Sequence, residues 1–251
     1  MPYRKLLFRH KERYPVLDVL RGVTFLSMLL YHACWDLAYL FRVDMPWYRT
    51  ESAYVWQQSI CWTFILLSGF CFSLGAKGLR RSIVVLLSGW LVSLVSEVFL
   101  PDSLIQFGVL TLIGSGMLLL VATEPWLRRV NPYAGAAVFF ALFLFVRAVM
   151  QGQIDWLTVP SEWCVDLFTA YLGFPPESFW STDYFPVFPW IFLYLTGYFL
   201  YRVFQQNNWL RIFRAFRCKP LEWVGKYCLY LYLVHQPVIY GVLTVWFLLV
   251  R

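Results

Sequence analysis

Four ionisable side chains lie in one otherwise apolar stretch near the N-terminus, LDVLRGVTFLSMLLYHACWDLAYLF: Asp18, Arg21, His32 and Asp36. At about 100° per residue on an α-helix, all four fall within one stripe about 60° wide. Ionisable groups at bilayer depth cost several kcal/mol unless they face one another or a wet cavity. This stripe should therefore face the interior of a helical bundle.

His32 and Asp36, one helical turn apart, have the chemistry of a general base and the carboxylate that orients it. A carboxylate on one ring nitrogen fixes the tautomer and leaves the other nitrogen free to take a proton. The alternative is a satisfied hydrogen bond between the two with no catalytic role. In the same way Arg21 either holds a phosphate near the start of the helix or forms an (i, i+3) pair with Asp18.

A second polar group interrupts the last apolar stretch, where His235 and Gln236 precede Pro237. Proline cannot donate a backbone hydrogen bond, so we expect the helix to kink or open there. His235 is then either a structural partner of that kink or part of a functional site. Three further polar residues are candidates for binding the substrate or for supporting the residues that do. They have structural interpretations as well: Gln106 as an interfacial cap, and Asp183 with Tyr184 as the turn that leads into a helix.

The composition indicates a membrane protein. Of the 251 residues 60% are hydrophobic and 14% are charged, which excludes a soluble globular protein, and the 21% of aromatic residues excludes disorder. We expect one all-α transmembrane domain over residues 1–251, a bundle of about seven helices of about 20 residues each. The predicted spans are 16–41, 54–75, 82–100, 105–122, 133–150, 186–204 and 224–249. Splitting the last span at Pro237 would give eight.

Charge predicts the orientation of these spans. Sixteen Lys and Arg residues fall in alternate connecting segments, beginning with the basic residues 1–15, against four in the others. The positive-inside rule places the N-terminus in the cytoplasm and the C-terminus outside. The net charge of +7 is distributed over these short segments and forms no basic face, so we expect no nucleic-acid partner.

The longest connection, residues 151–185, is expected outside the cytoplasm. It carries five acidic residues, no Lys or Arg, and many aromatic residues, which favours an ordered cap on the outer interface. Residues 209–217 alternate aromatic or aliphatic and basic side chains, as a short interfacial helix does. The six cysteines show no CxxC pair and predict neither a disulfide framework nor a metal site.

The run LDVLRGVTFLSMLLYHACWDL resembles the start of bacterial relatives of the heparan-alpha-glucosaminide N-acetyltransferase catalytic domain. Arg21 and His32 also match the signature of an arginine, ten residues and a histidine found in membrane acyltransferases. The other similar segments are TFILLSGFCFSLG, IQFGVLTLIG, DYFPVFPWIFLYLTGY and LEWVGKYCLYLYLVHQPV. His235 and Gln236 lie in the last of these, and Thr111 stands where many relatives have a histidine.

The resemblance implies a multi-span acyltransferase in the bacterial cytoplasmic membrane. Such an enzyme moves an acyl group, usually acetyl, from cytoplasmic acyl-CoA to a glycan or another hydroxyl or amine acceptor, often across the membrane. We expect Arg21, Lys77, Arg80 and Arg81 to bind the CoA phosphates and the outer loop to shape the acceptor site. Transfer would be direct, with His32 as base, or would pass through an acyl-His32.

A rival interpretation is a non-catalytic seven-span transporter or receptor, in which the charges inside the membrane bind an ion or a small ligand. A transporter usually carries broken helices in both halves of the chain, whereas this sequence shows one clear break, at Pro237. Binding of acyl-CoA separates the two classes.

Overall fold

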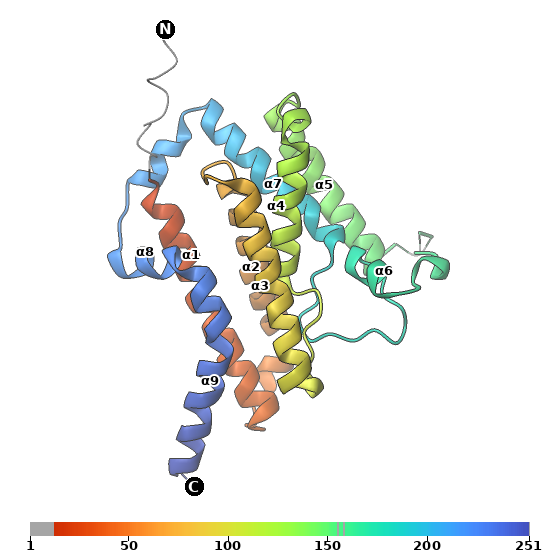
Figure 1. Ribbon diagram of the computed structural model, residues 1–251, viewed down its shortest axis with the longest axis vertical. Coiled ribbons are helices and arrows are strands. Elements are labelled where there is room, and N and C mark those ends of the chain that lie inside the picture. The colour runs from red at the N-terminus through yellow and green to blue at the C-terminus, as the bar shows by residue number, and fades with distance from the viewer. Residues whose placement is uncertain (1–12, 155, 158, 251) are drawn as a thin grey trace.

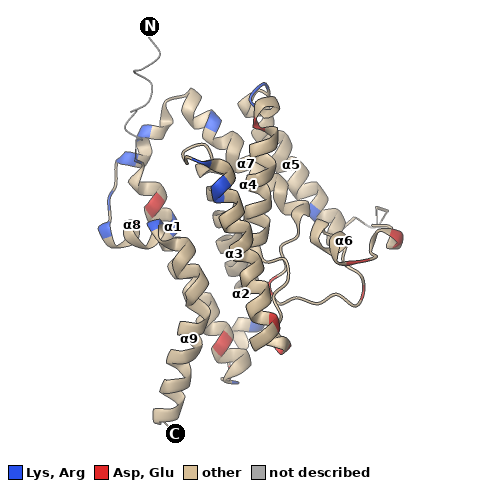
Figure 2. Ribbon diagram, viewed as in Figure 1, with Lys and Arg blue, Asp and Glu red and all other residues tan. Residues whose placement is uncertain are grey.

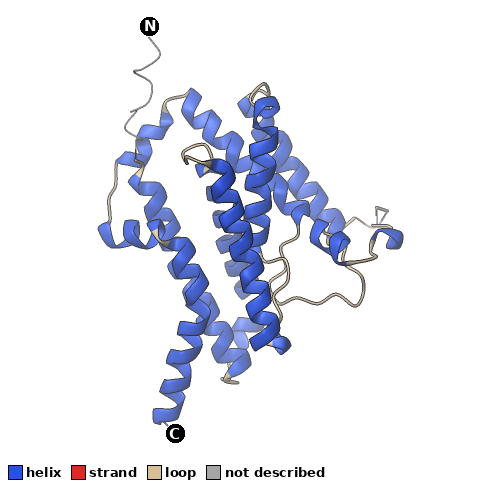
Figure 3. Ribbon diagram, viewed as in Figure 1, coloured by secondary structure: helices blue, strands red, loops and turns tan. Residues whose placement is uncertain are grey.

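The computed structural model describes residues 13–250 apart from 155 and 158. Within these residues the chain is helical and contains no strand (Figures 1 and 3). The α-helices are α1 (Pro15–Trp35), α2 (Glu51–Cys71), α3 (Gly78–Phe99), α4 (Val109–Leu127), α5 (Pro132–Met150), α6 (Leu167–Leu172), α7 (Val187–Gln206), α8 (Lys219–Lys226) and α9 (Cys228–Val250). A π-helical turn, Asp36–Leu40, continues α1.

The predicted helical membrane bundle is confirmed, and the exact number of spans stays a prediction. Six described helices are long and apolar enough to cross a membrane: α1 with its π-helical extension, α3, α4, α5, α7 and α9. The predicted second span corresponds to α2, which has 21 residues but is not among these six. Its first turns carry Glu51, Gln57 and Gln58, which lower the hydropathy of a helix that is otherwise of spanning length.

Two predicted boundaries are wrong. The last span starts at Cys228 and not at 224, because residues 224–226 belong to a separate helix, α8, which ends at Lys226. The chain therefore turns near Tyr227, and α9 continues through Pro237 without the expected opening. The fourth span starts at Val109, since the residues directly before it are not helical and bond to the segment before α7: the Phe185 N–H donates to the Phe107 carbonyl at 2.9 Å.

The helices pack closely around α7, which contacts α2, α4 and α5. Its Tyr194 and Phe199 are completely buried. Glycines let backbones touch: a Cβ at Gly69 of α2 would lie 2.0 Å from the Tyr194 carbonyl oxygen, and one at Gly197 would lie 2.2 Å from the Leu66 carbonyl oxygen. Small residues at helix contacts are typical of membrane bundles. In the remaining part of the bundle α3 packs on α4, and α1 packs on α8, α2 and α9.

The basic connecting segments gather at the end of the bundle where α1 begins (Figure 2). They are the α2–α3 turn, the α4–α5 turn and the segment between α7 and α8. Most of the predicted basic segment 1–15 lies outside the described residues. The clustering is what the charge pattern predicts, and the cytoplasmic location of this end stays a prediction.

The long connection 151–185 contains a short helix that is tied to the bundle. Asp166 caps α6 through the Thr169 backbone N–H, and the Tyr171 hydroxyl lies 2.5 Å from the Ser115 hydroxyl of α4. The short helix predicted within residues 209–217 is present as a 3₁₀-helix, Trp209–Arg214. Its Ile212 is exposed, as an interfacial anchor would be.

Candidate active site

Two histidines that are far apart in the sequence meet between α1 and α9. The ring centroids of His32 and His235 lie 4.9 Å apart, with an interplanar angle of 62°. His235 is buried, and the aromatic rings of Tyr232 and Phe25 lie 5.1 Å and 6.5 Å from it. The residue predicted as base therefore has a second imidazole as its neighbour.

The tautomer of His235 follows from its backbone contact. Its Nδ1 is hydrogen-bonded to the Tyr232 carbonyl oxygen. A carbonyl oxygen only accepts, so Nδ1 carries the proton of the neutral ring and Nε2 carries the lone pair. This Nε2 is buried and has no hydrogen-bond partner in the described part of the chain. His235 thus presents an oriented proton acceptor inside the protein.

Asp36 is completely buried, and its partner is Gln236, one residue beyond His235. Gln236 Nε2 donates to Asp36 Oδ1 at 2.6 Å. The predicted hydrogen bond between Asp36 and His32 is wrong: none joins them among the described residues. The helix widens into a π-turn at Asp36, so the spacing of an ideal α-helix no longer holds there. The other oxygens of the pair, Asp36 Oδ2 and Gln236 Oε1, are buried without a described partner.

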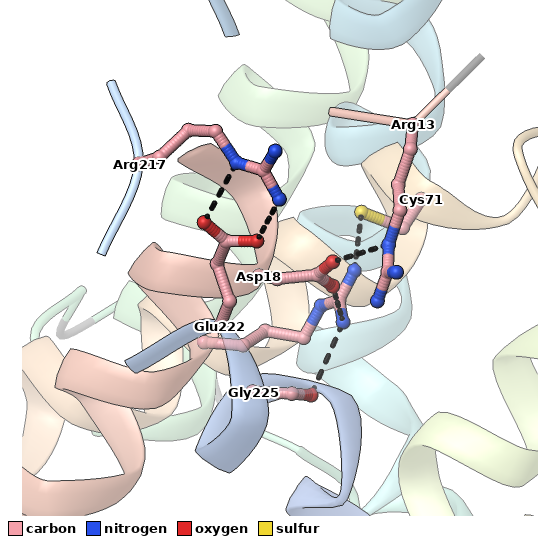
Figure 4. Close-up of polar contacts among 7 residues, drawn as sticks. Arg13, Asp18, Cys71, Arg217, Glu222 and Gly225 are labelled. Atoms are coloured by element: carbon pink, nitrogen blue, oxygen red, sulfur yellow. Dashed lines mark hydrogen bonds and ion pairs between the residues drawn. The ribbon is translucent and has the colours of Figure 1, made fainter. Parts of the chain in front are cut away.

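Arg21 lies near the start of α1 and connects three helices. Its guanidinium donates to Asp18 Oδ1 at 2.7 Å and to the Gly225 carbonyl of α8 at 3.3 Å, and Nη2 lies 3.6 Å from Cys71 Sγ of α2. Figure 4 shows Asp18, Cys71 and Gly225 converging on this point, together with the neighbouring ion pair of Arg217 and Glu222. The (i, i+3) pair is confirmed, and phosphate binding by Arg21 stays a prediction.

The three basic residues predicted to help bind phosphate differ in position. Lys77 and Arg80 are exposed at the α2–α3 turn. Arg81 turns inward over Gly75, where an added Cβ would lie 1.2 Å from its Nη1. That nitrogen is buried and has no described partner. Arg81 is also within electrostatic range of the Tyr194 hydroxyl, so of the three it is the one aimed into the bundle.

Asp183 lies at the N-terminus of α4, where its carboxylate accepts a hydrogen bond from the Val109 backbone. Burial raises the pKa of this carboxyl from 3.8 to about 6. The carboxyl lines a cavity of about 10 Å³ together with Gly89 and with Tyr232 of α9. A cavity of this size holds about one water molecule.

Gln106 and Tyr184, both predicted to bind substrate or to support the residues that do, hold the loop in the described structure. The Gln106 backbone N–H donates to the Ser181 hydroxyl at 2.9 Å, and the Tyr184 hydroxyl donates to the Ala170 carbonyl of α6. These hydrogen bonds fix the chain on both sides of Asp183, at Ser181 and at Tyr184. A direct contact of either residue with substrate stays a prediction.

Sequence reasoning missed Tyr232 and Cys71. Tyr232 lines the cavity beside Asp183 and also contacts the His235 ring. In a helix rich in aromatic residues, nothing in the sequence distinguishes this tyrosine as part of a site. From the sequence Cys71 is expected to be a small packing residue, whereas in the structure it contacts the Arg21 guanidinium. Thr111 is almost completely buried, and a Cβ added at Gly89 would lie 2.6 Å from the Thr111 Oγ1. Within the described residues, no three His, Cys, Asp or Glu side chains come together as a metal site would require.

Comparison with known proteins decides the family. The model of the family described as heparan-alpha-glucosaminide N-acetyltransferase, catalytic, matches residues 13–237. The chain belongs to the heparan-alpha-glucosaminide N-acetyltransferase catalytic family. No curated protein and no solved structure matches it.

The match to the heparan-alpha-glucosaminide N-acetyltransferase family includes every residue of the candidate site. It begins just before α1 and ends directly after Gln236, so that both histidines and their polar neighbours lie within it. Together with the helices long enough to span a bilayer, membership indicates a multi-pass membrane acetyltransferase.

Proposed function

We propose that this protein transfers an acetyl group from acetyl-CoA to a hydroxyl or amine of a sugar-like acceptor at the meeting point of His32 and His235. One observation carries the proposal: three acceptor atoms, Asp36 Oδ2, Gln236 Oε1 and His235 Nε2, are buried there without a described partner. Buried polar atoms are normally paired. A ligand that brings several O–H or N–H groups would satisfy them.

The histidine pair supplies the base. As the acceptor oxygen or nitrogen attacks the thioester carbonyl, its proton passes to the imidazole pair, in which the hydrogen bond of His235 to the Tyr232 carbonyl holds one ring in a fixed tautomer. The tetrahedral intermediate then expels the CoA thiolate, which takes the proton back. Asp36 and Gln236 bind the acceptor and place its nucleophile.

The CoA end of the donor binds at the basic end of the bundle. Arg81 offers a buried guanidinium nitrogen without a described partner, and Arg21 lies across the same region beside Cys71. Arg21 precedes His32 by eleven residues, about 16 to 17 Å along a helix, so a long flexible donor could reach from one to the other. With this end in the cytoplasm, the donor is the cytoplasmic acetyl-CoA pool.

The acceptor approaches from the opposite end, past Asp183 and Tyr232. A carboxyl beside an aromatic ring suits a sugar or a cationic amine. Only His235 and Ile239 of α9 are buried, so α9 is held by few side chains. Small movements of α9 away from α1 would open the histidine pair to both substrates.

The experiment uses the purified protein in proteoliposomes, with labelled acetyl-CoA and glucosamine as the probe acceptor. We expect release of CoA together with labelled N-acetylglucosamine. His32→Ala should lower the rate by about 10²- to 10⁴-fold, the usual contribution of a general base. Cys34→Ala, a small change on the same helix outside the site, should keep the wild-type rate.

Two results would contradict the proposal. One is full acetyl transfer by the His32→Ala variant. The other is the absence of measurable acetyl-CoA binding by the wild-type protein alongside transport of a solute, which would favour a transporter. Omitting glucosamine separates the two chemical routes, because acetylated protein accumulates only if a covalent acyl-His32 forms.

A further inference from the structure

A groove with a volume of about 530 Å³ lies where α2 begins and α5 ends, on elements other than those that hold the histidine pair. Its polar lining residues are Tyr54, Arg147, Gln151 and Gln153, and Trp62 forms part of its wall. This is room for a small molecule or for a lipid headgroup.

Arg147 is held in this groove by aromatic rings. Its guanidinium carbon lies 5.0 Å from the ring centre of Trp190, 5.6 Å from that of Trp62 and 5.9 Å from that of Phe143. Phe143 is completely buried and Trp190 nearly so, so water is excluded from that side of the guanidinium. No acidic side chain pairs with Arg147 within the described ranges. Its positive charge is fixed in place and not neutralised.

The polar groups around Arg147 leave hydrogen-bond donors available. The Tyr54 hydroxyl accepts from Arg147 Nη2 at 2.8 Å and from Gln151 Nε2 at 3.4 Å. Gln151 Oε1 accepts in turn from Gln153 Nε2 at 3.2 Å. The proton of the Tyr54 hydroxyl and the other N–H groups of Arg147 have no acceptor among the described contacts. A fixed positive charge with free donors selects an anion with several oxygens.

The surroundings of the groove indicate where that anion comes from. α5 is long and apolar enough to span a membrane, and Arg147 lies in its last turn, at the depth of lipid headgroups. Leu144, which also lines the groove, is 45% exposed, and the adjacent Phe145 is 49% exposed. The groove therefore opens along an apolar helix face of the kind that acyl chains cover.

We propose that this groove binds the phosphate of an anionic lipid headgroup, held by Arg147 and Tyr54, with the acyl chains along α5. The site is separate from acetyl transfer: the groove is formed by α2 and α5, and the histidine pair by α1 and α9.

The test titrates detergent-purified protein with dioctanoyl phosphatidylglycerol and measures bound lipid by native mass spectrometry. Arg147→Gln should weaken binding by about tenfold or more, the worth of a charge-assisted contact. Arg129→Gln, which removes one exposed charge from the α4–α5 turn, is the matched control and should bind as wild type does. Tyr54→Phe removes a single donor and should weaken binding about fivefold, which keeps the test decisive if the arginine variant does not fold.

A competition arm identifies the source of the phosphate. Inorganic phosphate in hundredfold excess should leave the lipid bound if the acyl chains contribute. Unchanged lipid affinity in both the Arg147→Gln and Tyr54→Phe variants would overturn the proposal. Displacement of the lipid by inorganic phosphate would also overturn it, since the site would then hold a free anion.

Discussion

Replacing Gly225 with alanine tests how the structure brings His235 to His32. Gly225 lies near the end of α8, and a Cβ added there would lie 1.8 Å from the Asp18 carbonyl oxygen of α1. The obstacle is backbone, so it cannot rotate away. α8 would have to move by about 1.2 Å to bring the contact to 3.0 Å, the shortest that real Cβ atoms show.

This displacement has two expected consequences. It weakens the hydrogen bond from Arg21 to the Gly225 carbonyl, now 3.3 Å, and overpacking of this kind costs about 1–3 kcal/mol of stability. It also moves the start of α9, which begins three residues later and carries His235. A misplacement of about 1 Å near reacting groups can lower kcat about 100-fold.

The assay is thermal unfolding in detergent together with the rate of acetyl transfer. Gly241→Ala on α9 is the matched control, because nothing lies within 4 Å of its added Cβ. That variant should be neutral or slightly stabilising, since alanine favours a helix over glycine by about 1 kcal/mol. Equal melting temperatures and equal rates for Gly225→Ala and Gly241→Ala would refute the inferred role of the α1–α8 contact.

Three further predictions concern single side chains. Gln236→Ala should destabilise the fold by about 1–3 kcal/mol in denaturant titrations, since it leaves Asp36 buried without its donor. A variant as stable as the wild-type protein would contradict the pairing of Gln236 with Asp36. Because the pKa of Asp183 in the folded state is raised from 3.8 to about 6, the stability of the protein should fall as the pH rises from about 4 to about 6. The melting temperature of Asp183→Asn should not fall with pH in this way. Arg81→Gln should raise the KM for acetyl-CoA about tenfold with kcat unchanged. Replacement of the exposed Arg80 by Gln should change neither constant. Equal changes of KM in the two variants would argue against a donor site at the inward-facing Arg81.

Much of the fold could be predicted from the sequence, because bilayer thickness and helix geometry constrain apolar runs strongly. The placement of Asp18 and Arg21 on one face of α1 followed from the helical repeat alone. The pair of Asp18 and Arg21 followed as well, since it depends on neighbours within one turn.

The partners of His32 and Asp36 could not be predicted in this way. Asp36 binds Gln236, 200 residues away, and His32 meets His235, and both contacts depend on where α8 turns the chain. The position of α8 depends on close backbone contacts at Gly22 of α1 and Gly225 of α8, which leave no periodic signal in the sequence. The π-turn at Asp36 also departs from the repeat on which the prediction rested.

The central claim is that His32 and His235 act as one base. The most direct measurement is the kcat of acetyl transfer for His32→Ala, His235→Ala and the double variant in purified protein. We expect each single change to lower kcat by about 100-fold or more and the double variant to be little slower than the slower single one, as for residues that act as a unit. Wild-type kcat in either single variant, or losses that multiply in the double variant, would contradict it.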